Sequence, residues 1–96
     1  MSRRERPHEA EGNRSPEQAF GFALRRIRLK RGLSQQRLAD KSGYHRTYIG
    51  LLERGQKSPS LRTIFNIAAT LQVKPSEILE RVQRLVGSTG ERSHAS

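Results

Sequence analysis

The sequence predicts a small all-α domain with five helices, and three observations support this prediction. Apolar residues recur three or four positions apart in five separate stretches, which is the periodicity of one buried helix face. Serine, proline and glycine residues stand at most of the expected helix ends. No stretch alternates apolar and polar residues for long enough to predict a strand, and no internal repeat is visible.

The first helix is expected to begin directly after Ser15. Ser15, Pro16 and Gln18 form the pattern of an N-cap, a first-position proline and a capping-box partner. Gly32 is expected to end the helix. Its apolar stripe consists of Phe20, Leu24 and Ile27.

Outside this stripe the first helix carries a basic run, which we interpret as a solvated face that raises the electrostatic field. The run consists of Arg25, Arg26, Lys30 and Arg31. Phe22 and Leu29 also fall outside the stripe. These two side chains are expected to be exposed, or else to be covered by a terminal arm or by a second protein surface.

Four shorter helices are expected to follow, over residues 35–41, 45–54, 61–71 and 75–86. Ser34 and Ser60 are the predicted N-caps of the first and third of these helices. Pro75 suits the first position of the last one. His45 and Lys74 occupy the two remaining N-cap positions, where neither side chain is favoured, so water is expected to satisfy the backbone N–H groups there.

The predicted domain spans residues 15–86 of the 96, between a disordered arm over 1–14 and a disordered tail over 87–96. Both ends are polar and lack apolar periodicity. Arginines in the arm could instead contact a polyanion, but the glutamates between them favour disorder. A hydrophobic content of 32% without Trp leaves only a small core, so self-association is expected to add stability.

The charge points to a polyanionic partner, because 19 Lys and Arg against 9 Asp and Glu give a formal net charge of +10. An acidic membrane surface is the rival partner. No segment approaches the ~20 consecutive apolar residues of a membrane span, and the amino terminus lacks the apolar core of a secretory signal, so we expect no membrane association and a cytoplasmic location. Without Cys, and with three scattered His, no disulfide, metal site or cofactor is predicted.

A helix, a glycine turn and a second helix are predicted within residues 34–55, in the segment SQQRLADKSGYHRTYIGLLERG. Two helices that cross steeply after a short turn need a small side chain at their contact, here Ala39, and a turn residue with positive φ, here Gly43. Ile49 and Leu52 are expected to anchor the second helix to the core. The outward face of that helix would be free to enter a major groove, and it consists of Arg46, Thr47, Gly50 and Leu51.

At these residues the sequence resembles the phage-repressor family, the Xre/Cro-type helix-turn-helix regulators, over residues 20–79. The resemblance is carried by RGLSQQRLA, SGYHRTYIGLLERG and SPSLRTIFNIAATLQVKPSEIL, in the order and spacing of that family's five-helix domain. Within the family, RTYI followed by LERG looks most like the controller proteins of restriction–modification systems. The resemblance implies a transcription regulator that binds double-stranded operator DNA.

Arg46 is the predicted base-reading residue, because its guanidinium can pair with guanine O6 and N7; the alternative is a phosphate contact or a solvated side chain. Thr47 could touch a phosphate or a thymine methyl group. Leu51 could meet thymine methyl groups, or be an incidental exposed leucine. Tyr48 resembles a family position close to the DNA backbone, and partial burial of its ring against the preceding helix is the alternative.

The resemblance also implies contacts that position the protein without reading sequence. Gln35 would bond a phosphate and brace the recognition helix, and Gln36 could share this role. Backbone contacts in the following loop are implied for Arg54, Lys57 and Ser58. Arg28 and Glu53 are instead implied to form a partly buried salt bridge that ties the first helix to the third, so neither is expected to contact DNA.

The last helix carries more apolar surface than one small core needs, with five apolar residues spread over roughly 100°. The resemblance assigns Ile78 and Leu79 to the core of the monomer. The predicted homodimer interface therefore consists of Phe65, Val82, Leu85 and Val86. The alternative is that this helix folds back and buries all five residues within one chain.

Other function classes have weaker support. An enzyme is not expected, since there is no Cys, no glycine-rich phosphate loop and no convincing His with a carboxylate and a nucleophile. Three Phe and two Tyr, without any sheet, disfavour RNA binding. The alternative function is an antitoxin-like module that binds DNA and a toxin protein, which copurification of a second protein would reveal.

Overall fold

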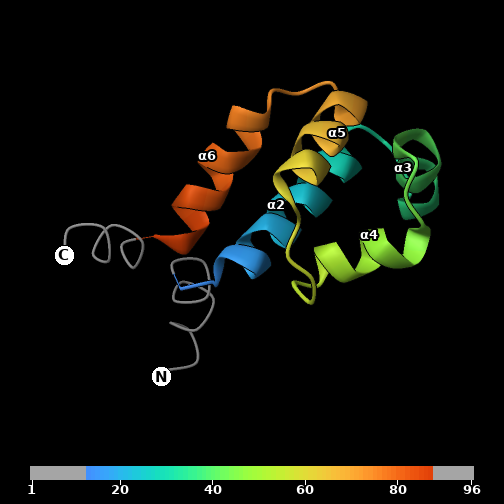
Figure 1. Cartoon of the computed structure of the whole chain (residues 1–96). Helices are drawn as coiled ribbons and strands as arrows, with labels where there is room; N and C mark the ends of the chain where they lie inside the picture. The colour runs from blue at the N-terminus through green and yellow to red at the C-terminus, as the bar shows by residue number, and fades with distance from the viewer. Residues whose placement is uncertain (1–12, 88–96) are drawn as a thin grey trace.

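The computed structural model describes residues 13–87, and within them it confirms the predicted all-α fold of five helices (Figure 1). The helices are α2 (Pro16–Lys30), α3 (Gln35–Ser42), α4 (Arg46–Glu53), α5 (Leu61–Leu71) and α6 (Pro75–Val86). Most of the predicted arm and tail, residues 1–12 and 88–96, lies outside the described residues. No helix in the described part is long and apolar enough to cross a membrane.

Three serine caps set the starts of α2, α3 and α5. Ser15 Oγ accepts a hydrogen bond from the Gln18 N–H at 3.1 Å, and Gln18 Oε1 accepts one from the Ser15 N–H at 3.1 Å, which confirms the capping box. Ser34 and Ser60 each accept a hydrogen bond at 3.0 Å from the N–H three residues later. Each cap satisfies a backbone donor that the helix itself leaves unpaired.

The other two helices begin without a side-chain cap, as the sequence predicts. His45 makes no capping hydrogen bond at the start of α4, and Lys74 makes none at the start of α6. At Lys74 the Glu77 carboxylate nevertheless accepts a hydrogen bond from the backbone N–H at 2.8 Å. Helix α6 therefore has half of a capping box, while α4 has none.

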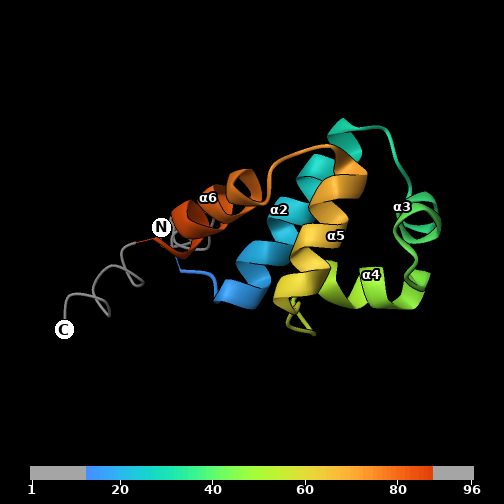
Figure 2. The same cartoon turned by 45° about the horizontal axis from the view of Figure 1, so that its top comes forward.

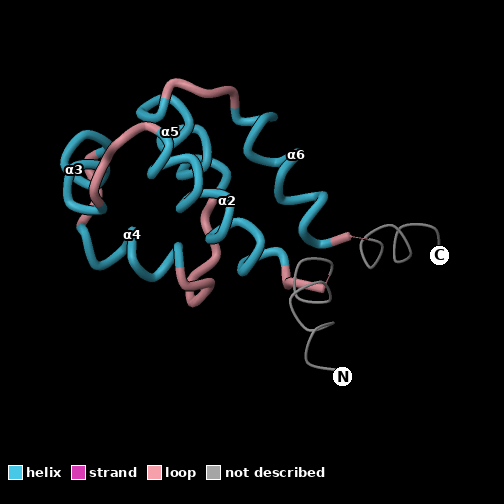
Figure 3. Tube along the Cα trace, turned by 180° about the vertical axis from the view of Figure 1, so that it is seen from behind, coloured by secondary structure: helices cyan, strands magenta, loops and turns pink. Residues whose placement is uncertain are grey.

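The five helices enclose one core, with α6 at one side of the molecule and α3 and α4 at the other (Figure 1). Helix α2 packs against α6 and α4, α3 packs against α4 and α5, and α5 also packs against α6, as the view from behind shows (Figure 3). The core consists of Phe20, Leu24, Ile27, Leu38, Ala39, Ile49, Leu52, Ile67, Ala68, Leu71 and Ile78. Residues from all five helices thus hold α3 and α4 in place.

Because Gly21 has no side chain, the backbones of α2 and α4 lie in close contact at this position. A Cβ atom placed on Gly21 would lie 2.4 Å from the Leu52 carbonyl oxygen and 2.5 Å from the Glu53 carbonyl oxygen. Both atoms belong to the backbone, so neither can rotate away. The end of α4 therefore rests directly on the backbone of α2, at a position that the sequence analysis did not single out.

Helix α6 is rotated relative to the predicted assignment of core and surface. Ile78 is fully buried as expected, but Leu79 is 42% exposed, so its assignment to the core is wrong. Val82, expected beyond the core, instead packs against it. Ile78 and Val82 are four residues apart and share one helix face, whereas Leu79 lies about 100° further round the helix.

Candidate DNA-binding surface

Helices α3 and α4 form the predicted helix-turn-helix. Gly43 follows α3 with φ 82° and ψ 16°, a left-handed conformation that glycine adopts without steric cost. Figure 2 shows α3 nearly end-on while α4 runs across the view, so the two helices cross steeply. Ala39, Ile49 and Leu52 are fully buried, which confirms the small contact residue and the two anchors.

A polar network around Thr63 fastens the turn and α4 to α5. The Tyr44 hydroxyl donates to Thr63 Oγ1 at 3.3 Å, and the Tyr48 hydroxyl shares a hydrogen bond of 3.3 Å with the same atom. Ser60 Oγ donates to it at 3.0 Å. The two tyrosine rings lie 5.2 Å apart, and Thr63 is only 5% exposed. Neither Tyr44 nor Thr63 was predicted to position α4, because the two tyrosines lie 15 or more residues from Thr63 in the sequence.

The outward face of α4 begins with Arg46 and Thr47, which are both exposed and whose side chains make no hydrogen bond among the described residues. Leu51 is half-buried. Gly50 is buried rather than outward as predicted, because the Arg54 guanidinium lies over it: a Cβ atom on Gly50 would be 3.1 Å from Arg54 Nη1. Arg54, not Gly50, therefore provides the surface of this part of the helix.

Three of the predicted contact residues, Tyr48, Gln35 and Gln36, make contacts within the protein. The Tyr48 ring is half-buried and packs against the core, so the structure supports burial over a position on the DNA backbone. The Gln35 side-chain amide donates to Glu53 Oε1 at 3.0 Å, which leaves its backbone N–H, in the first turn of α3, to face an anion. Gln36 is exposed, and its amide donates to Asp40 at 2.9 Å within the same helix.

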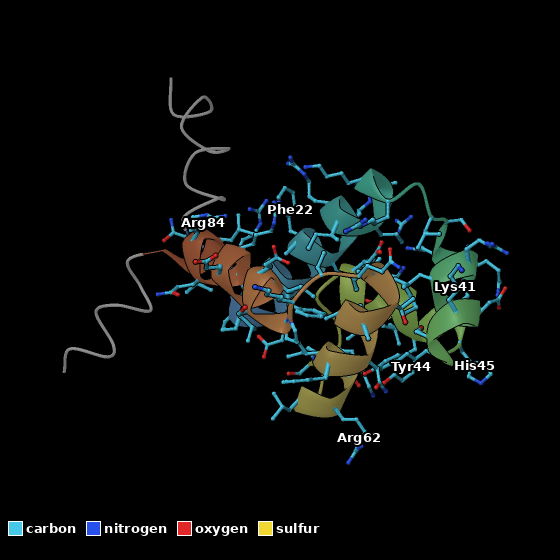
Figure 4. All side chains as sticks on the ribbon, turned by 90° about the horizontal axis from the view of Figure 1, so that it is seen from above. Phe22, Lys41, Tyr44, His45, Arg62 and Arg84 are labelled. Carbon is cyan, nitrogen blue, oxygen red and sulfur yellow. The ribbon has the colours of Figure 1, made fainter. Side chains whose placement is uncertain are left out.

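The loop after α4 continues the basic surface. Arg54, Lys57 and Ser58 are all exposed, as their predicted role requires. Between residues 35 and 58 both carboxylates are occupied, since Asp40 accepts from Gln36 and Glu53 is paired with Arg28. None of the Lys and Arg side chains in this segment lies within 4.0 Å of a carboxylate of the described residues. These side chains belong to Arg37, Lys41, Arg46, Arg54 and Lys57. Figure 4 shows Lys41 and His45 at the opposite end of the molecule from Arg84 of α6.

Arg28 and Glu53 form the predicted salt bridge, and it is buried more deeply than expected. Arg28 Nε donates to Glu53 Oε2 at 2.6 Å, and Nη2 donates to Oε1 at 2.9 Å, in a two-pronged arrangement. The two side chains are only 7% and 3% exposed. Arg28 Nη1 also donates to the Leu33 carbonyl at 2.8 Å. The pair therefore holds the carboxyl end of α4 against α2 and does not face solvent.

Sequence comparisons match the same region of the chain. The helix-turn-helix family model matches residues 24–78. Control protein C.BamHI from Bacillus amyloliquefaciens is 44% identical over 62 residues, which are 64% of this chain and 76% of that protein. Control protein C.SmaI from Serratia marcescens is 40% identical over 58 residues, 60% of this chain and 69% of that protein.

A solved structure shows the same similarity in three dimensions. The restriction-modification controller protein C.AhdI from Aeromonas hydrophila is 44% identical and superposes with a TM-score of 0.62, covering 64% of this chain and 92% of that one. The family match takes in the whole of α3, the turn, α4 and α5. The chain therefore belongs to the helix-turn-helix family, among the Xre/Cro-type DNA-binding regulators of transcription.

Proposed function

We propose that the protein regulates transcription as a homodimer that binds a palindromic operator in cytoplasmic DNA, without enzymatic activity of its own. The observation that carries this proposal is the outward face of α4. The side chains of Arg46 and Thr47 are exposed and make no hydrogen bond within the described residues. Ile49 and Leu52, which are fully buried, hold the same helix against the core. A rigid helix with a free arginine near its amino end suits base recognition in a major groove.

Replacing Arg46 with alanine is expected to weaken binding to the operator by ~1–3 kcal/mol, chiefly at one base pair, because the bidentate pairing with guanine is lost. The operator would first be selected by the wild-type protein from random-sequence duplexes. Each base pair of the selected site would then be varied, and the affinity of both proteins measured by fluorescence anisotropy.

Lys57→Ala is the matched control, since it removes an equal charge from the loop after α4. It should weaken specific and non-specific duplexes alike and reduce the magnitude of the slope of log affinity against log salt by ~0.9 for each of the two subunits. A uniform loss for Arg46→Ala across all base pairs would contradict its role in base recognition.

An apolar patch on α5 and α6 supports the homodimer. Phe65 is 55% exposed and Leu79 is 42% exposed. Leu79 also lines a surface pocket of about 180 Å³ together with the half-buried Ile64 and Val82, so it lies beside α5, and Ile64 is the chain neighbour of Phe65. A small protein seldom leaves such a patch in water, and a second copy related by a two-fold axis would cover it.

The patch retains Phe65 and Val82 of the predicted interface, but Leu85 does not belong to it, and the half-buried Val86 does not line the pocket that Leu79 shares with α5. Leu85 lies on the other side of α6, where it lines a pocket with Phe22 and Ala23 of α2. Leu79, assigned to the core by the sequence, takes its place. Two-fold pairing through the patch would repeat α4 about 34 Å away, one turn of DNA, as a palindromic site requires.

Phe65→Asp combined with Leu79→Asp is expected to convert the dimer to a folded monomer, because both side chains are exposed in one chain and charge repulsion would oppose their burial between two. Sedimentation velocity at micromolar concentrations measures the change. Leu29→Asp is the matched control, since Leu29 is 51% exposed on α2 and outside the patch. A wild-type protein that stays monomeric both free and on operator DNA would contradict the proposal.

A further inference from the structure

Beside the carboxyl end of α4 lies a surface pocket of about 360 Å³ that the helix-turn-helix does not account for. Three arginines from different segments line it: Arg14 before α2, Arg25 on α2 and Arg54 after α4. Gln18, Phe22 and Arg25 are four and three residues apart, so they share one face of α2. The pocket is thus built from two helices and the segment that leads into the first.

The one carboxylate in the pocket cannot neutralise these arginines. Glu53 also lines the pocket, but both of its oxygens accept hydrogen bonds from Arg28, and Oε1 accepts another from Gln35. Its charge is therefore compensated from the core side. The Arg25 side chain makes no hydrogen bond or ion pair among the described residues. Among the residues that the structure describes, the pocket consequently gathers three positive charges without an unpaired carboxylate to oppose them.

The guanidinium of Arg14 packs against the ring of Phe22, while one of its nitrogens, Nη1, has no hydrogen-bond partner among the described residues. Its Cζ lies 4.1 Å from the centre of the Phe22 ring, close enough for a cation–π contact. Its Nη1 atom is buried without a hydrogen-bond partner among the described residues. A buried guanidinium donor without a partner costs free energy that an anion would recover. Phe22, which the sequence left as exposed or covered, thus serves as a platform for Arg14.

The pocket begins where the recognition face of α4 ends. Arg54 follows Thr47 by seven residues, two helical turns, and so lies on the same side of the helix. We infer that the Arg14, Arg25 and Arg54 pocket binds a phosphodiester of the DNA backbone, next to the groove that α4 enters. This inference rests on the proposed operator binding through α4. It adds a contact from α2, whose basic run the sequence analysis had assigned only to the general electrostatic field.

Arg25→Ala tests the inference, because Arg25 is exposed and its loss should leave the fold intact. On a duplex selected from random sequences by the wild-type protein, we expect a five- to tenfold loss of affinity and a salt slope reduced in magnitude by ~0.9 for each of the two subunits. A non-cognate duplex should show the same change in slope. Arg84→Ala removes an equal charge from exposed α6 and should change neither quantity appreciably. Arg14→Gln should act in the same direction as Arg25→Ala.

Ethylation interference on the selected duplex locates the contact. Ethylation of one or two phosphates beside the base pairs read by Arg46 should weaken the wild-type protein but no longer affect Arg25→Ala. Equal affinities and equal interference patterns for Arg25→Ala and Arg84→Ala would overturn the inference. So would a loss of thermal stability in Arg25→Ala with unchanged DNA affinity, which would show that Arg25 serves the fold and not DNA binding. A wild-type protein that selects no sequence would instead refute the proposed operator recognition, while the slope on the non-cognate duplex would still test the pocket.

Discussion

Gly21→Ala is expected to lower the free energy of unfolding by about 3 kcal/mol, although alanine is the better helix former by about 1 kcal/mol. The added methyl group would stand 2.4 and 2.5 Å from two backbone carbonyl oxygens of α4. Because both obstacles are backbone atoms, α2 and α4 would have to move apart and loosen the packing around Leu52. Urea denaturation followed by circular dichroism measures the loss.

Gly50→Ala provides the control, since it makes the same substitution in the helix that Gly21 contacts. There the nearest atom is Arg54 Nη1 at 3.1 Å, the far end of a flexible side chain that can shift. We expect Gly50→Ala to be neutral or slightly stabilising. If both variants unfolded at the same urea concentration, the close contact between α2 and α4 would be disproved.

Breaking the Arg28–Glu53 pair from one side is expected to cost about 3–5 kcal/mol of unfolding free energy. Both side chains are almost fully buried, so Arg28→Met would leave the Glu53 carboxylate with Gln35 as its side-chain donor. Glu53→Met would leave the Arg28 guanidinium with only the Leu33 carbonyl. Each single variant therefore strands one charge away from water.

The double variant Arg28→Met with Glu53→Met separates this penalty from the value of the pair itself. Because no stranded charge remains, its loss should be much smaller than the sum of the two single losses. Denaturation curves of all four proteins complete the cycle. Strictly additive losses would mean that the two side chains act independently, contrary to the two short hydrogen bonds between them.

Local signals explain why the helices could be predicted from the sequence. Ser15, Ser34 and Ser60 each act on an N–H three residues away, and Gly43 adopts its turn conformation through its own backbone. Periodicity also identified the buried stripe of α2, the inward residues of α3 and the two anchors of α4. Such features need no knowledge of distant residues, so the boundaries and the helix-turn-helix follow from neighbouring sequence alone.

The residues that the sequence misplaced depend on contacts between helices. Periodicity shows that α6 has a wide apolar face, but only the packing against α2 and α5 decides that Val82 turns inward and Leu79 outward. The position of Gly50 along α4 places it on the outward face of the helix, yet the Arg54 side chain covers it. Gly21 has no local signature, because its requirement comes from carbonyl oxygens about 30 residues later in the chain.

The orientation of α4 and the recognition of a DNA sequence depend on different residues, so evolution or design can alter one without the other. The Glu53 carboxylate, at the last residue of α4, accepts donors from Arg28 of α2 and Gln35 of α3, so one group orients all three helices. The side chains of Arg46 and Thr47 take no part in this arrangement or in any other hydrogen bond of the described residues. New side chains at these two positions could therefore retarget the protein to a different DNA sequence while the angle at which α4 meets the groove is inherited unchanged.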